Sequence, residues 1–321
     1  MEDRLLPHAL IIAGPTASGK SALALFLAEQ FGGVIINADS MQIYRELRIL
    51  TARPTPEDHA RVPHLLYGVR PAAEAGSVAW WRDQALAAMR QAHAEGKLPI
   101  LTGGTGLYFT ALTEGLTDIP DPGEAARAEA RWLLAELGAP KLHSRLTAAD
   151  PETASRLRPE DSQRIARAWE VWRGTGLGLA QWQKARGKPA PWRFTGILLD
   201  PPRADLRAAI ARRFDAMLEQ GALEEVRALL ALGLDPALPA MRAHGVRELA
   251  GVLHGEMTLE EAAKRVELAT SQYTKRQGTW FRHRPPAGHD RPRTIITRFT
   301  DPAQFPATNL RELVSFVEGA G

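Results

Sequence analysis

The chain has 321 residues, of which 45% are hydrophobic and 24% are charged, and its formal net charge is +3. This length and balance are typical of a globular protein with one large or two modest domains. It has no cysteine, which excludes disulfides, thiol nucleophiles and cysteine zinc sites, and its nine histidines lack metal-binding spacing. Because we find neither a signal-peptide pattern nor a run of membrane-spanning length, we expect a cytoplasmic protein.

The clearest local pattern is the segment Gly14-Pro15-Thr16-Ala17-Ser18-Gly19-Lys20-Ser21, which matches the phosphate-loop pattern G-x-x-x-x-G-K-[ST]. An apolar run precedes it and an alanine- and leucine-rich segment follows it, as expected for a buried strand, a glycine turn and a helix start. The backbone N–H groups of such a turn and the helix dipole behind it bind phosphate. We therefore expect Lys20 to contact a terminal phosphate and the Ser21 hydroxyl to bind Mg²⁺.

Two further apolar runs end in segments that could carry chemistry. Residues 34–38 lead into Asp39, and residues 97–102 lead into the glycine-rich segment 103–106 with Thr105. Because the carboxyl ends of parallel strands meet at one edge of a sheet, we expect both segments to lie beside the phosphate loop. Asp39 is either a general base or a helix N-cap, and the glycine-rich segment either binds phosphate or only turns the chain.

The remaining chain predicts an α/β protein with a parallel sheet, helices on both faces and a helical insertion. Residues 51–76 contain four prolines and are expected to be irregular, and a helix is expected over residues 80–95. The Asp- and Pro-rich stretch 118–122 marks a boundary. We predict a discontinuous core of residues 1–120 and 191–321, with the insertion at 121–190. The further expected elements are helices over 124–137, 141–148, 162–172, 205–232 (broken at Gly221), 258–282 and 309–318, and strands over 194–200 and 294–299.

Basic residues are concentrated near the end of the chain. Nine of them lie between Lys264 and Arg298, where only Glu267 and Asp290 oppose them. Such an excess suits a polyanion such as RNA, but a solvated helix face has the same composition, and both interpretations stay open.

Six segments, taken together and in order, resemble the tRNA dimethylallyltransferases. They are GPTASGKS (14–21), NADSMQIYR (37–45), ARPT (52–55), GGTGLY (103–108), DSQRIAR (161–167) and KRQGTWFR (275–282). The resemblance implies a P-loop kinase-like core that transfers a dimethylallyl group from dimethylallyl diphosphate to the exocyclic amine of the adenosine 3′ of the anticodon. It also implies Mg²⁺ as the cofactor, the anticodon stem-loop of tRNA as the partner, and a monomer.

The resemblance also implies a role for individual residues. Asp39 would take the proton from the attacking amine, and Thr105 would lie at the diphosphate and the target nucleotide. Arg213 would hold the diphosphate together with residues 14–21. The residues expected to contact the tRNA are Asp39, Ser40, Met41, Gln42, Thr105, Arg127, Gln163, Arg164, Ile165, Ala166, Arg167, Arg242, Arg247, Lys275, Arg276, Gln277 and Arg282.

The sequence departs from the family pattern at three places. Arg53 stands where lysine is usual, His244-Gly245-Val246 replaces an I-G-Y type segment, and Ala209 stands where arginine is common. Three alternatives remain open: an adenylate isopentenyltransferase that acts on a free nucleotide, a P-loop kinase of small molecules, and a noncatalytic nucleotide switch that binds RNA.

Overall fold

The computed structural model describes residues 6–185, 187–286 and 291–319. The chain forms two compact units, which we call the core unit (Met1–Thr113 and Ala190–Gly321) and the insertion unit (Glu114–Pro189). The insertion unit starts at Glu114, earlier than the predicted residue 121. The segment that leads into its first helix and the segment that follows its last helix are hydrogen-bonded to each other. The Thr117 hydroxyl donates a hydrogen bond of 3.1 Å to the Ala185 carbonyl.

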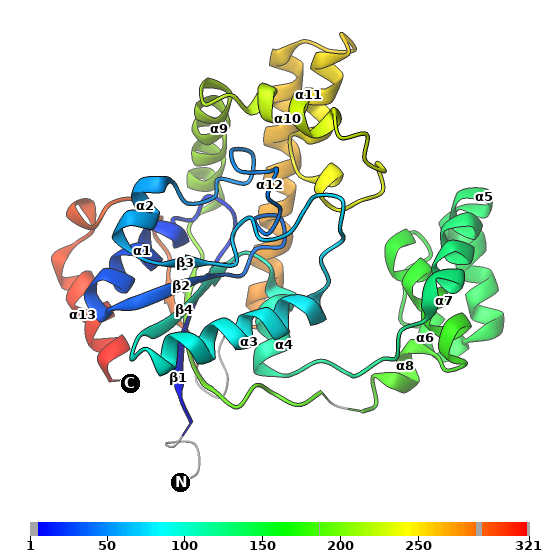
Figure 1. Ribbon diagram of the computed structural model, residues 1–321, viewed down its shortest axis with the longest axis horizontal. Coiled ribbons are helices and arrows are strands. Elements are labelled where there is room, and N and C mark those ends of the chain that lie inside the picture. Colours follow the sequence, from blue (N-terminus) through cyan, green and yellow to red (C-terminus); the bar gives the residue numbers. More distant parts are fainter. Residues whose placement is uncertain (1–5, 186, 287–290, 320–321) are drawn as a thin grey trace. The chain divides into compact units, whose positions relative to one another are not determined.

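The core unit is built on a parallel sheet, as the sequence predicted. Among the described residues it has six strands in the order β3-β2-β4-β1-β5-β6, and every pair is parallel. Figure 1 shows these strands with helices around them. The strands are β1 His8–Ala13, β2 Gly33–Asn37, β3 His64–Leu65, β4 Leu98–Gly103, β5 Arg193–Leu199 and β6 Arg293–Ile295.

Both faces of the sheet are covered, which is why the strands read as continuous apolar runs. Alternate residues of β1 point to opposite faces: Leu10 and Ile12 pack against α1 and α13, and Ile11 packs on the side of α3 and α4 (Figure 1). The helices of this unit are α1 Lys20–Phe31, α2 Pro56–Arg61, α3 Val78–Ala94, α4 Gly106–Thr113, α9 Arg203–Glu219, α10 Ala222–Leu230, α11 Val246–Leu253, α12 Leu259–His283 and α13 Ala307–Glu318, with 3₁₀ turns at Ala240–Arg242 and Pro302–Gln304.

The insertion unit is helical, and its first helix is bent where the sequence predicted a break. Gly138 has a left-handed φ of 73° and interrupts the helix. The Asp161 carboxylate accepts the Arg164 N–H at 3.3 Å and so caps the helix that carries the DSQRIAR segment. The helices are α5 Gly123–Ala149, α6 Pro151–Ala154, α7 Ser162–Thr175 and α8 Leu179–Trp182.

Two local predictions were wrong. Residues 51–76 are not irregular throughout, because they contain α2, which Thr55 starts with a capping box, and the short edge strand β3. The expected strand over 294–299 ends at Ile295. The chain leaves the sheet there to support the phosphate loop, since Arg298 Nε donates to the Ala17 carbonyl at 2.8 Å and the Phe299 N–H to the Ser18 carbonyl at 3.2 Å.

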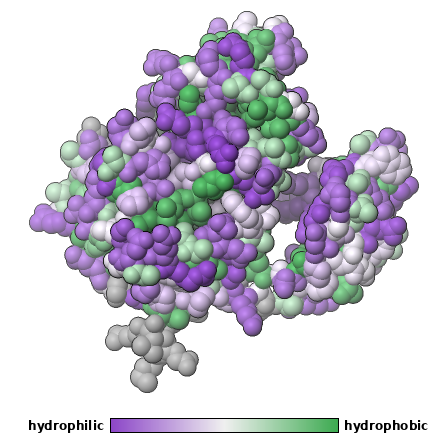
Figure 2. All heavy atoms as spheres, viewed as in Figure 1, coloured by the Kyte–Doolittle hydropathy of each residue, from purple (hydrophilic) through white to green (hydrophobic). Residues whose placement is uncertain are grey.

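The face of the molecule seen in Figure 2 is mostly polar. Figure 2 shows hydrophilic residues spread over the visible side of the core unit, with smaller hydrophobic areas among them. Large exposed hydrophobic side chains such as Val69 and Leu232 occur singly, which is normal for a globular surface. In the part of the chain that the structure describes, no helix is both long enough and apolar enough to cross a bilayer.

Candidate active site

The phosphate loop lies between β1 and α1 in a conformation that only certain residues can adopt. Ala17 and Gly19 have left-handed φ angles of 66° and 94°. A Cβ on Gly19 would lie 1.7 Å from the Phe299 carbonyl oxygen, so this position accepts glycine alone. Turns with alternating backbone handedness direct successive N–H groups to one point, where they bind anions.

The Lys20 side chain lies at the phosphate loop, among other charged groups. Its Nζ is 3.4 Å from the Pro15 carbonyl oxygen. Burial lowers the pKa of the Lys20 ammonium to about 8; the Asp39 carboxylate opposes this shift, and the Arg213 guanidinium adds to it. Lys20, Asp39 and Arg213 are therefore close enough to influence one another, although they come from three different elements. A bound phosphate would favour the charged lysine.

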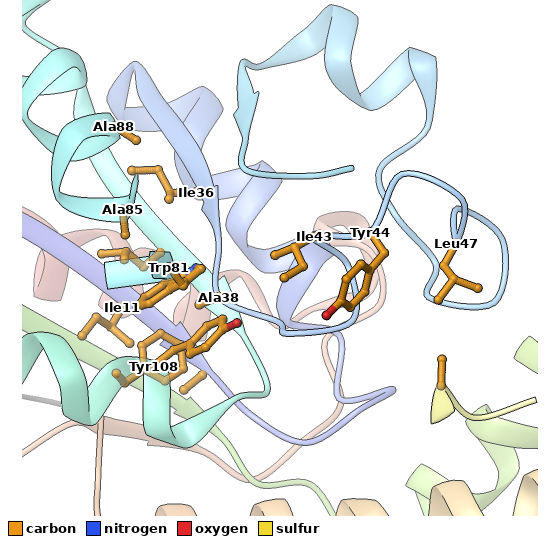
Figure 3. Packing of buried hydrophobic residues seen from close by; sticks show 14 of the residues in the cluster. Ile11, Ile36, Ala38, Ile43, Tyr44, Leu47, Trp81, Ala85, Ala88 and Tyr108 are labelled. Atoms are coloured by element: carbon orange, nitrogen blue, oxygen red, sulfur yellow. The ribbon is translucent and has the colours of Figure 1, made fainter. Parts of the chain in front are cut away.

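Asp39 follows β2 and is held by its neighbours. Its N–H donates to Asn37 Oδ1 at 2.9 Å, and Asn37 Nδ2 donates to its carbonyl at 3.0 Å. Trp81 Nε1 donates to the Asn37 carbonyl at 2.8 Å, and its ring stacks on Tyr108 with centroids 4.1 Å apart (Figure 3). Asp39 Oδ1 accepts the Met41 N–H at 2.9 Å, whereas Oδ2 has no hydrogen bond among the described residues. One carboxylate oxygen thus fixes the chain, and the other can accept a proton.

The ends of β2 and β4 meet, as the sequence predicted. The Ser40 N–H donates to Thr105 Oγ1 at 2.9 Å, and the Thr105 N–H donates to the Ala38 carbonyl at 3.2 Å. The Thr105 hydroxyl also lies 3.3 Å from Ser40 Oγ. In this structure Thr105 therefore positions the segment that carries Asp39.

Gln277 on α12 joins the phosphate loop to the glycine-rich segment after β4. Its Oε1 accepts the Thr16 N–H and its Nε2 donates to the Gly104 carbonyl, both at 2.9 Å. The residue is 4% exposed. The expectation that Gln277 contacts RNA does not fit this position, because the buried amide already bonds two loops of the protein.

Gln277→Leu is expected to destabilise the fold by about 1–3 kcal/mol for each buried group left without a partner, and to weaken anion binding at the phosphate loop. Thermal unfolding and diphosphate titrations would measure the two effects. Gln272→Leu is the matched control, because Gln272 lies on the same helix and is exposed. Equal behaviour of the two variants would show that the bridge has no energetic role.

A cavity of about 380 Å³ opens beside Asp39 and the phosphate loop. Arg213 and Thr16 lie in its polar part, and the Arg213 Nη2 donates to the Thr51 carbonyl at 3.3 Å. Burial lowers the pKa of the Arg213 guanidinium, and the Asp39 carboxylate opposes that shift. The apolar part of the wall consists of Met41, Leu50, Ile210, Phe214, Met217, Ala243 and Val266. The cavity suits a ligand that joins an apolar group to an anion.

Aromatic and cationic side chains line another part of this cavity. The His244 ring packs against Tyr273 at a centroid distance of 5.2 Å, and the Arg276 guanidinium lies 5.5 Å from the Tyr273 ring. Burial lowers the pKa of the His244 imidazole, and Arg276 adds to this effect, whereas the Glu248 and Asp39 carboxylates oppose it. An aromatic contact therefore exists at the segment where the sequence departs from the family pattern.

The other residues expected to bind RNA are divided between the two units. Arg242 lines the cavity and is exposed, and Arg247, Lys275 and Arg282 are exposed on the core unit. Gln42 is half-buried, and its Nε2 donates to the Thr51 and Ala52 carbonyls at 2.9 and 3.0 Å. The side chain of Gln42 therefore shapes the wall of the cavity.

In the insertion unit, three expected RNA contacts are surface arginines with acidic partners. Arg127 pairs with Asp121, Arg164 pairs with Asp161 at 3.4 Å, and Arg167 pairs with Glu170 at 3.1 Å. Such exposed pairs contribute about 0–1 kcal/mol and are readily exchanged for other anions. Gln163 is exposed and Ala166 is half-buried.

Ile165 is the clearest correction among the expected RNA contacts. It lies between Arg164 and Arg167 in the sequence, but its side chain is fully buried in the core of the insertion unit. Because α7 turns this position toward α5, the side chain cannot reach RNA. The exposed residues of this helical segment are Gln163, Arg164 and Arg167.

Several residues that shape the site were not found from the sequence. Glu225 on α10 accepts the backbone N–H groups of Arg48, Ile49 and Leu50 at 2.8, 2.7 and 2.9 Å, and so fixes one wall of the cavity. The position of Asn37 at the end of a predicted strand could have indicated that it shapes the site. Nothing in the sequence around Glu225 indicates its contacts. Ala209, where the family often has arginine, is 3% exposed and packs near Ala17 of the phosphate loop.

Comparison with known proteins identifies the family of this chain. The family model described as "IPP transferase" matches residues 42–284. The chain is 59% identical to the tRNA dimethylallyltransferase of Granulibacter bethesdensis, with 97% of this chain and 98% of the relative covered. It is 60% identical to that of Gluconacetobacter diazotrophicus, with 96% and 93% covered. The crystal structure of the tRNA isopentenylpyrophosphate transferase from Bacillus halodurans superposes with a TM-score of 0.67 at 32% identity and covers 98% of this chain and 96% of its own. The chain belongs to the IPP transferase family.

Proposed function

We propose that the protein transfers the dimethylallyl group of dimethylallyl diphosphate to the exocyclic amine of the adenosine 3′ of the anticodon in tRNA. The products are N6-(dimethylallyl)adenosine in the tRNA and diphosphate. The observation that carries this proposal is the shared cavity of Asp39 and Arg213 beside the phosphate loop. It offers a proton acceptor, an anion site and an apolar wall at one place.

The reaction forms a C–N bond to the amine and breaks the C–O bond to the diphosphate. An adenine amine is a weak nucleophile and must lose a proton during attack, which Asp39 Oδ2 can accept. The departing diphosphate gains negative charge, which the N–H groups of the phosphate loop, Lys20 and Arg213 stabilise. The apolar wall with Ile210 and Phe214 suits a branched five-carbon group and excludes water from the reacting carbon.

The donor set near the phosphate loop fits Mg²⁺ bound together with a diphosphate. Ser21 lies in the first turn of α1, and Ser18 Oγ is buried without a hydrogen-bond partner in the described structure. Among the described residues, no group of three or more His, Cys, Asp or Glu side chains could hold a metal alone. Mg²⁺ keeps several waters and is usually bound through one or two protein oxygens plus phosphates. Ser21 would hold the ion, which would neutralise diphosphate charge.

The tRNA would reach the cavity through residues of both units. An adenosine in a stacked anticodon loop must leave the stack before its amine can meet Asp39, as in other enzymes that modify a base. We assign the electrostatic part of this binding to Arg127, Arg164 and Arg167 in the insertion unit and to Lys275 and Arg276 in the core unit. We also propose that the protein acts as a monomer, in the cytoplasm where tRNA is used.

Replacing Arg164 or Arg167 with alanine is expected to weaken tRNA binding without changing dimethylallyl diphosphate binding. Each lost phosphate contact should reduce the slope of log K against log salt by about one unit. Arg173→Ala is the control, since Arg173 Nε donates to both Glu129 oxygens, at 3.2 and 2.9 Å, and so is less free to bind RNA. Binding isotherms for tRNA at several salt concentrations measure both the affinity and the slope for each variant. Unchanged affinity and slope in all variants would favour an acceptor that is a free nucleotide.

The affinity for dimethylallyl diphosphate is expected to fall as the pH rises above about 8. Burial lowers the pKa of the Lys20 ammonium to about 8, so the free protein carries this charge below that pH and loses it above. Binding then requires proton uptake, and Kd should rise by up to about tenfold for each pH unit above 8. Titrations from pH 7 to 9.5 measure this, and Lys20→Arg should abolish the dependence. A flat profile in the unmodified protein would contradict the assignment.

The reaction itself is tested by the product. The protein is incubated with tRNA, dimethylallyl diphosphate and Mg²⁺, and the digested nucleosides are analysed by mass spectrometry. We expect one N6-(dimethylallyl)adenosine for each tRNA molecule, at the position 3′ of the anticodon. A modified base elsewhere, or none, would refute the proposal.

A further inference from the structure

A second cavity lies beside the phosphate loop, on the side of the sheet that α1 covers. Its volume is about 320 Å³. Its wall shares no residue with the cavity of Asp39 among the described residues, because the chain at 51–53 separates the two: Thr51 lines one, and Ala52 and Arg53 line the other. The wall of this second cavity consists of Ser21, Ala22, Leu25, Ile35, Ala52, Arg53, Pro54, Asp58, Arg61, His64, Tyr67 and Thr102.

The segment between the cavities is rigidly held. The Gln42 amide bonds the carbonyls of Thr51 and Ala52, and Arg213 bonds that of Thr51 as well. Ala52 has a left-handed φ of 48°, which costs free energy in a residue other than glycine. These hydrogen bonds hold residues 51 and 52 in place between the two cavities.

Arg53 brings an incompletely bonded cation to this cavity. A guanidinium has five N–H donors, and within the described structure only Nη2 of Arg53 has a hydrogen bond, to the Arg45 carbonyl at 3.1 Å. Nε is buried and without a partner. Burial lowers the pKa of the Arg53 guanidinium, whereas the Glu225 and Glu46 carboxylates oppose this shift. Neither forms an ion pair with Arg53 among the described residues, so the guanidinium can still take up an anion.

Thr102 adds a second unsatisfied polar atom to the same wall. It lies near the end of β4, is 3% exposed, and its Oγ1 has no partner in the described part of the chain. Ser21, His64 and Tyr67 contribute further polar groups to the lining. The lining therefore offers several donors at one place.

Within the described lining, one acidic residue faces these donors, and Glu225 and Glu46 act on Arg53 from outside the lining. Asp58 is the one carboxylate of the lining, and its Oδ2 already accepts the Thr55 N–H at 3.0 Å. Arg61 also lines the cavity, but Glu29 binds its guanidinium through two hydrogen bonds of 2.8 and 3.0 Å. Arg53 is thus the cation that remains available, and the cavity is suited to a small oxyanion.

We infer that this second cavity is an anion site for inorganic diphosphate, separate from the cavity of Asp39, and that the diphosphate released by prenyl transfer occupies it on leaving. The role in product release rests on the proposed function, whereas the binding site itself does not. Ser21 lies next to Lys20, so the two sites are adjacent.

The test is calorimetric titration of the free protein with inorganic diphosphate, without tRNA. We expect two sites in the unmodified protein and one in Lys20→Ala. Arg53→Gln should weaken the remaining site by about 10- to 100-fold, as for loss of a hydrogen bond to a charged group, and Arg53→Lys should largely retain it. Arg61→Gln is the matched control in the same wall and should change the affinity less than about threefold, because Glu29 already neutralises Arg61.

Thr102→Val removes only a hydroxyl and keeps the shape, so it tests the site even where Arg53→Gln fails to fold, as judged by circular dichroism melting. It should weaken the second site and leave the first unchanged. Parallel titrations with inorganic phosphate show whether one phosphoryl group suffices. A single site in the unmodified protein, or one site lost equally in the Lys20 and Arg53 variants, would overturn the inference. Prenyl transfer is measured separately, so its absence would refute the proposed function and not the site.

Discussion

Asp39→Asn is expected to lower turnover by about 10²- to 10⁴-fold, the usual range for loss of a general base. Asparagine has the same size, and its amide oxygen can still accept the Met41 N–H that Asp39 Oδ1 accepts at 2.9 Å. The change therefore removes the proton acceptor and leaves the local chain bonded. Single-turnover rates with saturating tRNA and dimethylallyl diphosphate measure the effect, and thermal unfolding should be nearly unchanged.

Asp200→Asn is the matched control for this experiment. Asp200 also follows a strand of the sheet, but its carboxylate lies 3.7 Å from Arg282, and it does not line the cavity of Asp39. Its replacement should leave turnover close to that of the unmodified protein. If Asp39→Asn unfolds most of the protein while the folded remainder turns over normally, Asp39 is a structural residue and not the base.

Lys20→Ala is expected to lower turnover by about 10²- to 10³-fold, as for removal of one group that stabilises transition-state charge. Affinity for dimethylallyl diphosphate should fall as well, because the bound diphosphate loses its closest ammonium group. The affinity for tRNA should not change, since Lys20 Nζ lies at the phosphate loop, 3.4 Å from the Pro15 carbonyl. Titration with each substrate alone separates these effects. Normal turnover in Lys20→Ala would mean that the phosphate loop only supports the fold.

Much of the fold could be predicted because buried parallel strands have a simple sequence signature. The apolar runs that lead into the phosphate loop, Asp39 and the glycine-rich segment are all strands, and their ends meet at one edge. That geometry follows from parallel pairing alone. The helical insertion was visible because boundary residues and helix caps such as Asp161 depend on the local sequence.

The parts that could not be predicted depend on contacts between distant residues. Gln277 bonds Thr16 across 261 residues, and Glu225 bonds the turn at 48–50 across about 175. Neither glutamine nor glutamate has a local pattern that announces such a contact. Ile165 shows a different kind of error. All of residues 163–167 were expected to contact RNA because they belong to one family motif, but a helix exposes only some residues of such a segment, and Ile165 is buried.

The most direct test of the account is a comparison of acceptors. The protein is incubated with labelled dimethylallyl diphosphate and Mg²⁺, together with tRNA, with AMP or with no acceptor, and the label in each acceptor is counted. The account predicts label in tRNA, none in AMP, and loss of the tRNA signal in Asp39→Asn. Label that enters AMP and not tRNA, or tRNA labelling that survives in Asp39→Asn at the normal rate, would contradict it.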